Sequence, residues 1–296
     1  MEPDLAQLRA LRAAVDAGSL DGAAAALHVT PSAISQRLKA LESATGRILL
    51  VRSRPVRATA AGEHLLRVAR QVDLLLADAS RQLADEVEDA PVELAVAVNA
   101  DSLATWWLPA VAELRGEVVL DLRREDQDRT AALLREGTVV AAVTAAQRPI
   151  AGCTSMPLGV MRYRPVATPD FLAAWFGAGV TLDALRRAPV VHFDRDDDLQ
   201  RGWLRRRGVE TPPPGHHVPS TDTYEQAVRR GFGWGMLSEF QVRDTATDVV
   251  EPLDPAASVD VPLFWQRWKL RSPSLDRLTD VVVAAGRRVL LPVGGG

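Results

Sequence analysis

The segment from residue 30 to residue 39 carries polar side chains of a kind that reads DNA. Gln36 could form paired hydrogen bonds with an adenine edge, and serine hydroxyls can serve several bases. Lysine and arginine suit phosphates or the minor groove, as point charges or planar forks. The residues that we predict to contact DNA are Thr30, Pro31, Ser32, Ser35, Gln36 and Lys39, with Arg52 and Arg54 further along the chain.

A second group of polar residues lies later in the chain, near the ends of predicted strands and helices. Free backbone N–H groups at a helix N-terminus suit a carboxylate, and acidic side chains suit an ammonium or a guanidinium group. An amino acid presents a carboxylate and an ammonium close together. The candidates for binding such a ligand are Asp101, Ser102, Thr105, Glu125, Asp126, Thr144, Asp194, Thr221 and Asp222.

Two of these acids, Asp126 and Asp194, are the ones that we expect to select a basic ligand. Each follows a predicted strand, and the two strands belong to successive α/β units, so the acids would lie on either side of a cleft. Other roles stay open. Capping its helix could be the sole role of Asp222, and Asp101 could belong to a capping pair. The acids at 196–198 could lie in a solvated loop.

The residues directed at DNA need a helix that presents them, and the surrounding sequence predicts three short helices. Apolar residues recur at helical spacing over 5–15, and Gly18 ends that helix. Ser19 is a plausible N-cap for a second helix, and a third begins at Thr30 or Pro31. Apolar residues of the third helix form one stripe, so its polar residues occupy the opposite face. This arrangement is typical of a helix-turn-helix.

A small β-wing and a long helix follow. Residues 48–52 and 56–58 are predicted strands on either side of a turn, and Thr59 caps a helix that runs to about Val87. Apolar residues repeat along this helix in steps of three and four, and such a seam favours a partner helix. Packing against the chain's own body is the alternative. Unless the chain itself covers the seam, the pattern predicts that two chains pair.

From Pro91 onward, predicted strands alternate with helices in two successive units. This alternation implies parallel sheets covered on both faces, with a ligand cleft where the chain crosses between the units. The predicted fold is therefore α+β and multidomain. It comprises a winged helix-turn-helix (1–58), a long linker helix (59–90) and a two-lobed α/β effector domain like a periplasmic binding protein (91–296), with lobe I formed by 91–162 and 268–296 and lobe II by 163–267.

The charge distribution fits this division. The 296-residue chain has a net charge of −3, yet residues 1–60 hold eight basic and five acidic residues, so the remainder is acidic. A basic segment on an acidic body is the signature of a phosphate-binding module. The sequence predicts neither a membrane span nor a signal peptide, so we expect a cytoplasmic protein. The single cysteine, Cys153, excludes an internal disulfide, and no cofactor or metal is expected.

Two sets of segments resemble known regulators. The first resembles LysR-type transcriptional regulators and consists of Ser19–Glu42, Gly46, Leu50–Arg52 and Ala58–Gly62. The second is similar to the lysine- and arginine-responsive ArgP/LysG group of that family and consists of Asn99–Trp106, Ala188–Asp194 and Phe264–Trp268. The family usually has another residue at the position of Pro31, which leaves the individual base contacts open.

The resemblance covers nearly the whole chain and implies a function. It implies a regulator of amino-acid exporters and related genes that responds to lysine or arginine and forms dimers or tetramers through the linker helix. The expected partners are double-stranded DNA, a small-molecule effector and other copies of the chain, with RNA polymerase as a candidate.

Other functions are less well supported. An enzyme is disfavoured because the sequence has no nucleophile elbow, phosphate-binding glycine loop or histidine spacing for a metal. A periplasmic binding protein is opposed by the N-terminal winged helix and the missing signal peptide. A LysR-type regulator that senses a different metabolite, such as another amino acid or an aromatic acid, stays an open alternative.

Overall fold

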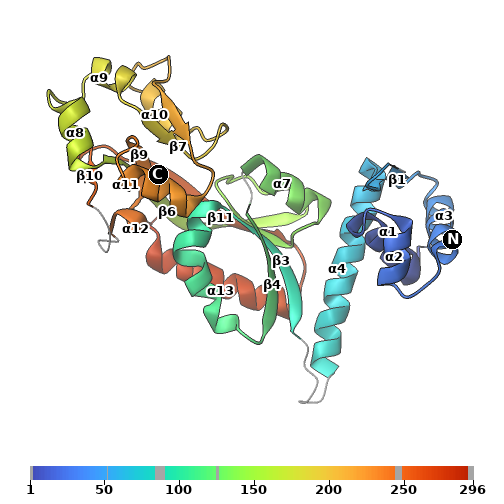
Figure 1. Ribbon diagram of the computed structural model, residues 1–296. Coiled ribbons are helices and arrows are strands. Elements are labelled where there is room, and N and C mark those ends of the chain that lie inside the picture. Colours follow the sequence, from blue (N-terminus) through green and yellow to red (C-terminus); the bar gives the residue numbers. More distant parts are fainter. Residues whose placement is uncertain (1–2, 52, 84–90, 125–126, 244–248, 293–296) are drawn as a thin grey trace.

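The structure, a computed structural model, describes residues 3–51, 53–83, 91–124, 127–243 and 249–292 (Figure 1). A small helical domain at the N-terminus is joined through one long helix to a larger α/β body with two lobes. This confirms the predicted fold class. Among the described residues, no helix combines the length and apolar character that a membrane span requires.

Three helices form the N-terminal domain, and their ends are set by local capping. Asp4 caps the first helix in a capping box with Gln7, and Ser19 caps the second by accepting a hydrogen bond from the Gly22 N–H at 3.0 Å. Gly46 ends the third helix in a left-handed conformation. The helices are α1 (Leu5–Asp16), α2 (Leu20–Ala26) and α3 (Pro31–Thr45). Leu11, Ile34 and Leu41 are fully buried in a core of this domain's own.

The predicted wing is present as two short antiparallel strands, β1 (Leu50–Val51) and β2 (Arg57–Ala58). Helix α4 (Ala60–Leu83) follows directly, and the Thr59 hydroxyl accepts from the Gly62 N–H at 3.1 Å. Gly62 is required here because a Cβ atom would lie only 2.0 Å from the Leu49 carbonyl oxygen. Absence of a side chain thus lets the linker helix pack closely against the wing.

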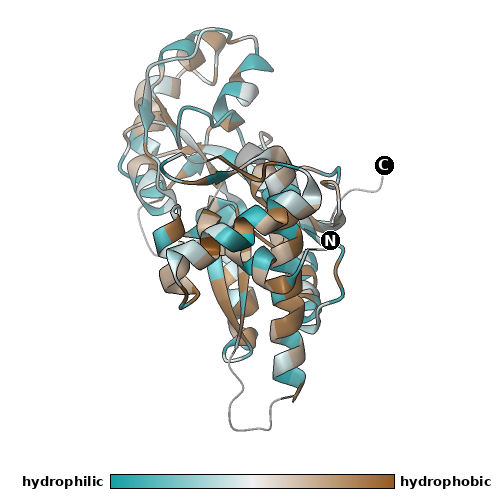
Figure 2. Cartoon of the chain, turned by 90° about the vertical axis from the view of Figure 1, so that its right-hand side faces the viewer, coloured by the Kyte–Doolittle hydropathy of each residue, from teal (hydrophilic) through white to brown (hydrophobic). Residues whose placement is uncertain are grey.

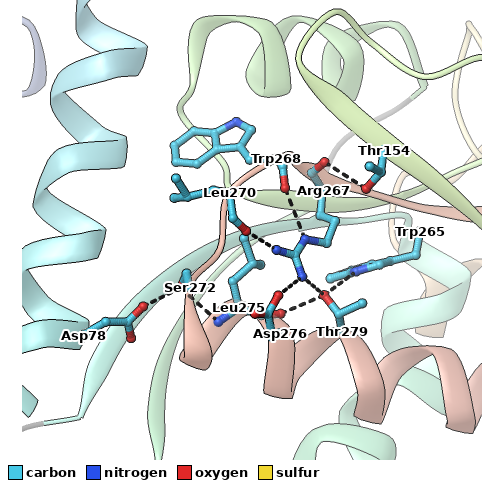
Figure 3. A network of polar contacts seen from close by, with 10 residues as sticks. All are labelled: Asp78, Thr154, Trp265, Arg267, Trp268, Leu270, Ser272, Leu275, Asp276 and Thr279. Carbon is cyan, nitrogen blue, oxygen red and sulfur yellow. Dashed lines mark hydrogen bonds and ion pairs between the residues drawn. The ribbon is translucent and has the colours of Figure 1, made fainter. Parts of the chain in front are cut away.

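One face of α4 docks on the α/β body of the same chain. Leu74 is buried in the main hydrophobic core, and Arg67 and Arg81 donate to backbone carbonyl oxygens of the body at 2.7 and 2.6 Å. The nearly buried Asp78 accepts from the Ser272 hydroxyl at 2.5 Å (Figure 3) and from the Ser274 hydroxyl at 2.5 Å. The linker helix and the adjoining lobe are therefore held together by apolar packing and by hydrogen bonds.

The apolar seam of α4 faces away from these contacts. Val68, Leu75 and Leu83 of the seam are exposed, Leu83 at 84%. Figure 2 shows a stretch of apolar residues in the C-terminal half of α4, before the polar residues of its last turn. The chain's own body therefore leaves these seam residues uncovered.

A seven-stranded mixed sheet runs through the α/β body in the order β10-β6-β11-β5-β3-β4, and β9 also pairs with β6. Its strands are β3 (Val92–Val98), β4 (Val118–Arg124), β5 (Ala141–Thr144), β6 (Cys153–Ala167), β9 (Gly235–Ser238), β10 (Glu251–Pro252) and β11 (Val259–Trp268). The expectation of parallel sheets holds for β3 with its neighbours β4 and β5. It is wrong for the other pairs, which are antiparallel.

Strands β6 and β11 connect the two lobes. They pair antiparallel from Val259 opposite Tyr163 to Trp268 opposite Cys153, with a register shift at Leu263/Phe264. Strand β6 is long and continues through Pro157 and Gly159. Gly159 is needed because a Cβ atom there would lie 2.5 Å from the Leu290 side chain. The predicted lobe boundaries thus fall within or at the end of these two strands, and residues 264–267 pair with β5 of lobe I.

The helices cover the sheet and build lobe II. In lobe I a continuous helical segment with one π-type turn comprises α5 (Ala100–Ser102), η1 (Leu103–Trp107), α6 (Leu108–Val111) and η2 (Ala112–Leu114), followed by α7 (Gln127–Glu136) and the closing α13 (Pro273–Val289). Lobe II has α8 (Pro169–Phe176), α9 (Leu182–Arg187), α10 (Leu199–Arg205), α11 (Thr221–Arg229) and α12 (Glu239–Arg243).

Lobe II also contains a parallel strand pair, β7 (Val190–His192) and β8 (Gly215–His217). His216 and His217 lie in β8. The imidazole of His217 stacks on that of the buried His192, with 5.4 Å between ring centroids. Three residues in a strand were too few to show a period in the sequence.

Candidate DNA-binding face and effector cavity

The predicted DNA-contacting residues of α3 share one exposed face. The apolar stripe of Ile34, Leu38 and Leu41 faces the core, which leaves the polar side chains outside. Thr30 caps the helix by accepting from the Ala33 N–H at 3.2 Å, and its hydroxyl lies 2.9 Å from that of Ser32. The exposed residues of this face are Thr30, Pro31, Ser32, Ser35, Gln36 and Lys39.

The wing lies next to this face. Pro31, Ser32 and Ser35 border a hollow of about 430 Å³ together with Ser53 and the exposed Arg54 of the wing. Arg52, the other predicted wing residue, lies outside the described residues. The fold thus brings side chains from the start of α3 and from the turn of the wing onto a single surface that combines hydroxyl groups with a guanidinium group. Such a surface can offer hydrogen bonds to base edges and a cation to phosphates.

A second hollow, with a volume of about 380 Å³, opens between the two lobes and is called the effector cavity below. Lobe I contributes residues from the end of β3 and the end of β4. Lobe II contributes the loop after β7 and the helices α10 and α11, and β6 forms part of the wall. Its lining residues include Asn99, Asp101, Arg124, Tyr163, Phe193, Asp194, Asp196, Asp197, Gln200 and Tyr224.

Acidic groups dominate this lining. Four aspartates face one arginine, Arg124, whose guanidinium lies 5.9 Å from the centre of the Phe193 ring in the other lobe. One of these aspartates, Asp194, also holds the loop after β7 in shape. One oxygen of Asp194 accepts from the N–H groups of Asp196 and Asp197 at 2.9 and 2.8 Å. The cavity therefore favours cations, and Arg124 provides one positive group for an anionic end of a ligand.

Asp101 stands at the junction of the lobes. The Tyr163 hydroxyl donates to its Oδ2 atom at 2.7 Å. Removal from bulk water raises the pKa of Asp101 above its ordinary value, the Tyr163 hydrogen bond lowers it, and the charge of Asp197 raises it further. Burial and the Asp101 charge in turn raise the pKa of Tyr163. Tyr163 is therefore a neutral donor at physiological pH.

Two amide side chains present unused acceptors in the cavity. The Gln200 amide nitrogen donates to the Val191 carbonyl at 3.1 Å and to the Tyr224 hydroxyl at 2.7 Å, which fixes the orientation of the amide. Its Oε1 atom has no hydrogen-bond partner among the described residues, and the same is true of Asn99 Oδ1. Buried acceptors without partners are uncommon and indicate a missing donor. Both atoms can accept N–H groups of a ligand.

The structure separates the predicted effector residues into three sets. Asp101 and Asp194 line the cavity. Glu125 and Asp126 lie outside the described residues. The remaining five are absent from the described lining: Ser102, Thr105, Thr144, Thr221 and Asp222.

Local structure explains why those five residues lie elsewhere. The helix begins at Ala100, so Thr105 is one turn inside it and donates to the Asp101 carbonyl. Ser102 and Thr221 are buried, and Thr144 accepts from the Ala146 N–H. Asp222 is exposed in the first turn of α11. For these positions the structure offers no contact with the cavity.

Sequence reasoning missed Asn99, Arg124, Tyr163, Gln200 and Tyr224. One usable signal was overlooked: the chain contains two tyrosines, and both line the cavity. A second signal was the position of Arg124 at the carboxyl end of a parallel strand, where α/β folds bind ligands. Gln200 gave no signal, because a single glutamine in a short helix is unremarkable.

Comparison with known proteins identifies the class. Residues 5–63 match the family described as bacterial regulatory helix-turn-helix proteins of the lysR family, and residues 88–287 match the LysR substrate binding domain. The chain belongs to the LysR-type transcriptional regulators. Within that family it belongs to the ArgP/LysG group, as the resemblance implied, and a regulator rather than an enzyme follows from this membership.

Two relatives of this group match over nearly their full lengths, one of them both in sequence and in structure. The lysine export transcriptional regulatory protein LysG of Corynebacterium glutamicum is 42% identical, with 97% of this chain and 99% of the relative covered. The crystal structure of ArgP from Mycobacterium tuberculosis is 43% identical, covers 97% of this chain and 98% of its own, and superimposes with a TM-score of 0.89. Full-length C. glutamicum LysG with bound effector Arg has 41% identity, covers 98% and 100%, and gives a TM-score of 0.82.

Proposed function

We propose that this regulator senses a basic amino acid, lysine or arginine, in the effector cavity between its lobes. The observation that carries the proposal is the charge of the lining: four aspartates against Arg124. A free amino acid with a cationic side chain has two positive groups and one negative group. The cavity offers the complementary set.

Within the cavity, the groups suggest how such a ligand would lie. Arg124 is suited to the α-carboxylate. Asp101 with Asn99 in lobe I, and Asp194 with Gln200 in lobe II, are suited to N–H groups. A ligand that bonds to both sets would bridge the lobes and favour their closure. Asp126, which was predicted to act together with Asp194, stays a candidate from the sequence alone.

The names of the relatives support the same assignment. C. glutamicum LysG is described as a lysine export regulator, and its structure contains arginine as the bound effector. By analogy, we infer that this chain controls a gene for an amino-acid exporter. A different metabolite, such as another amino acid or an aromatic acid, is the alternative, and the excess of acids in the cavity argues against an anionic effector.

The DNA-directed proposal rests on the exposed face of α3 with its adjoining wing. Thr30, Pro31, Ser32, Ser35, Gln36 and Lys39 would contact the major groove, and Arg52 and Arg54 the phosphates or the minor groove. The uncovered seam of α4 supports pairing of two chains in the cytoplasm, as a dimer or a pair of dimers. Two wings and two helices would then meet a roughly palindromic operator.

Calorimetry with lysine, arginine, leucine and an aromatic acid tests the effector. Wild-type protein should bind lysine or arginine and should bind leucine far more weakly, because leucine lacks the side-chain cation. The variant Asp194→Asn should lose affinity for both basic amino acids, whereas the matched control Asp222→Asn, an exposed acid outside the lining, should not. Binding of aromatic acids alone would overturn the basic-amino-acid assignment, and undiminished affinity in Asp194→Asn would remove Asp194 from the site.

A further inference from the structure

Two acids from different lobes share the effector cavity. Asp101 follows β3 in lobe I, and Asp197 lies in the loop before α10 in lobe II. They are close enough for the Asp197 charge to disfavour ionisation of Asp101. The two like charges therefore repel each other. Either a cation or a proton can relieve this repulsion.

Asp101 accepts fewer hydrogen bonds than Asp197 does. Its hydrogen bond with the Tyr163 hydroxyl from β6 is the only side-chain hydrogen bond recorded for it among the described residues. Asp197 is better satisfied, because its two oxygens accept from the N–H groups of Phe193 and Leu199 at 3.3 and 3.0 Å. The poorly satisfied acid is therefore the one that would gain most from a proton or from a ligand cation.

The other ionisable groups around Asp101 do not replace such a partner. Tyr163 on β6 and Tyr224 on α11 are buried phenols whose pKa values are raised by burial and by the nearby acids, so they stay neutral donors. Asp194 and Asp196 add further negative charge from lobe II. Arg124 is the cation of the described lining, and it lies over the Phe193 ring.

We propose that the effector's cationic group and a proton compete for the Asp101 carboxylate, so that effector binding releases a proton and is weakened in acid. The proposal rests on the proposed function, because it takes the ligand to be a basic amino acid. The proton leaves the Asp101 carboxyl group for the solvent, and the effector's N–H groups take its place. The regulator would then respond to pH and to the amino acid through one side chain.

The sign of the effect follows from linkage. The pKa of Asp101 is raised, and a bound cation would lower it, so the ionised form is the one that binds. Affinity is then full above the raised pKa and falls below it, by up to about tenfold per pH unit. Tyr163 lowers the pKa of Asp101 through its hydrogen bond. Removal of that hydroxyl should therefore move the loss of affinity to higher pH.

Titration calorimetry with full-length protein and arginine as the probe tests this. Binding would be measured across a range of pH values, and at each pH in two buffers of different ionisation enthalpy, which reports the number of protons released. Four proteins are compared: wild type, Asp101→Asn, Tyr163→Phe and the control Asp222→Asn. Tyr163→Phe keeps the aromatic ring, so it provides a second test should Asp101→Asn fail to fold.

The expected results differ for each protein. Wild type and Asp222→Asn should release a proton and lose affinity in acid. Asp101→Asn should bind about ten- to a hundredfold more weakly at neutral pH, with no proton release. Tyr163→Phe should show the wild-type profile displaced to higher pH.

Two different failures can be told apart. Tight arginine binding with constant affinity across pH and no proton release would overturn the competition and leave the proposed function standing. So would an unshifted profile in Tyr163→Phe, or wild-type pH dependence in Asp101→Asn. Failure of wild type to bind arginine or lysine at any pH would overturn the proposed function and this inference together.

Discussion

Two aspartates withdrawn from bulk water show how differently this chain uses the same side chain. Asp78 on the linker helix is 5% exposed, and each of its oxygens accepts a serine hydroxyl from the start of α13. Asp101 in the effector cavity is half-buried, has one hydrogen bond from Tyr163 and lies near a second acid. Among the described residues, both oxygens of the first carboxylate accept a hydrogen bond, whereas only one oxygen of the second does.

The surroundings of Asp78 explain its structural role. Ser272 also caps α13 by accepting from the Leu275 N–H, so the linker carboxylate is tied to the beginning of a helix (Figure 3). Arg267, close by, donates to Asp276, Thr279 and the Leu270 carbonyl. A polar network that is complete stabilises one arrangement. An incomplete one, as at Asp101, is available for a ligand.

The largest expected effect comes from breaking the satisfied site. Asp78→Ala leaves two buried serine hydroxyls without their acceptor, so the free energy of unfolding should fall by about 3 kcal/mol. Urea unfolding followed by circular dichroism measures this. The triple variant with Asp78→Ala, Ser272→Ala and Ser274→Ala should lose less unfolding free energy than the sum of the losses in the three single variants, because the three groups are coupled. Simple additivity would contradict a shared network.

Changing Asp101 should give the opposite pattern. In Asp101→Asn the ligand-free protein should be as stable as wild type or more stable, because the cost of withdrawing a charge from water and the repulsion with Asp197 are both gone. Its arginine affinity should drop. Thermal unfolding with and without arginine measures both quantities. A large loss of stability without ligand would place Asp101 with Asp78 as a structural residue.

The pH dependence of stability sharpens the contrast. Because the folded-state pKa of Asp101 is raised, its ionisation destabilises the ligand-free fold at neutral pH, and this penalty disappears as the pH falls toward the ordinary value of 3.8. The stability advantage of Asp101→Asn over wild type should therefore be greatest at neutral pH and should shrink in acid. Urea unfolding at a series of pH values measures the difference, and an advantage that grows in acid would contradict the assigned sign.

The smallest effect is expected at an exposed ion pair. Arg162 donates two hydrogen bonds to Asp260, each at 2.7 Å, and this contact lowers the pKa of Asp260. Because both side chains reach solvent, Asp260→Asn should hardly change stability at neutral pH. Any stability that the ion pair contributes at neutral pH should be lost as the pH falls through the lowered pKa of Asp260. Urea unfolding checks this, and a loss comparable to that of Asp78→Ala would show that hydrogen-bond satisfaction outweighs burial.

The sequence by itself determined the local structure and the class of protein. Helical periodicity and capping residues identified α1 to α3, the wing and the linker helix, because these signals act between neighbours in the chain. A predicted helix start pointed to Asp101, and a predicted strand end pointed to Asp194, as effector-binding candidates. The family resemblance supplied the class of ligand.

Only the tertiary structure decided how distant residues meet. Tyr163 reaches Asp101 from 62 positions away because the antiparallel pairing of β6 with β11 places it at the lobe junction, and Ser272 reaches Asp78 across 194 positions. Such contacts depend on strand register and on how the lobes and the linker pack. No period or cap records these quantities, so the sequence could name two of the acids in the cavity but could not distinguish a satisfied carboxylate from one that needs a ligand.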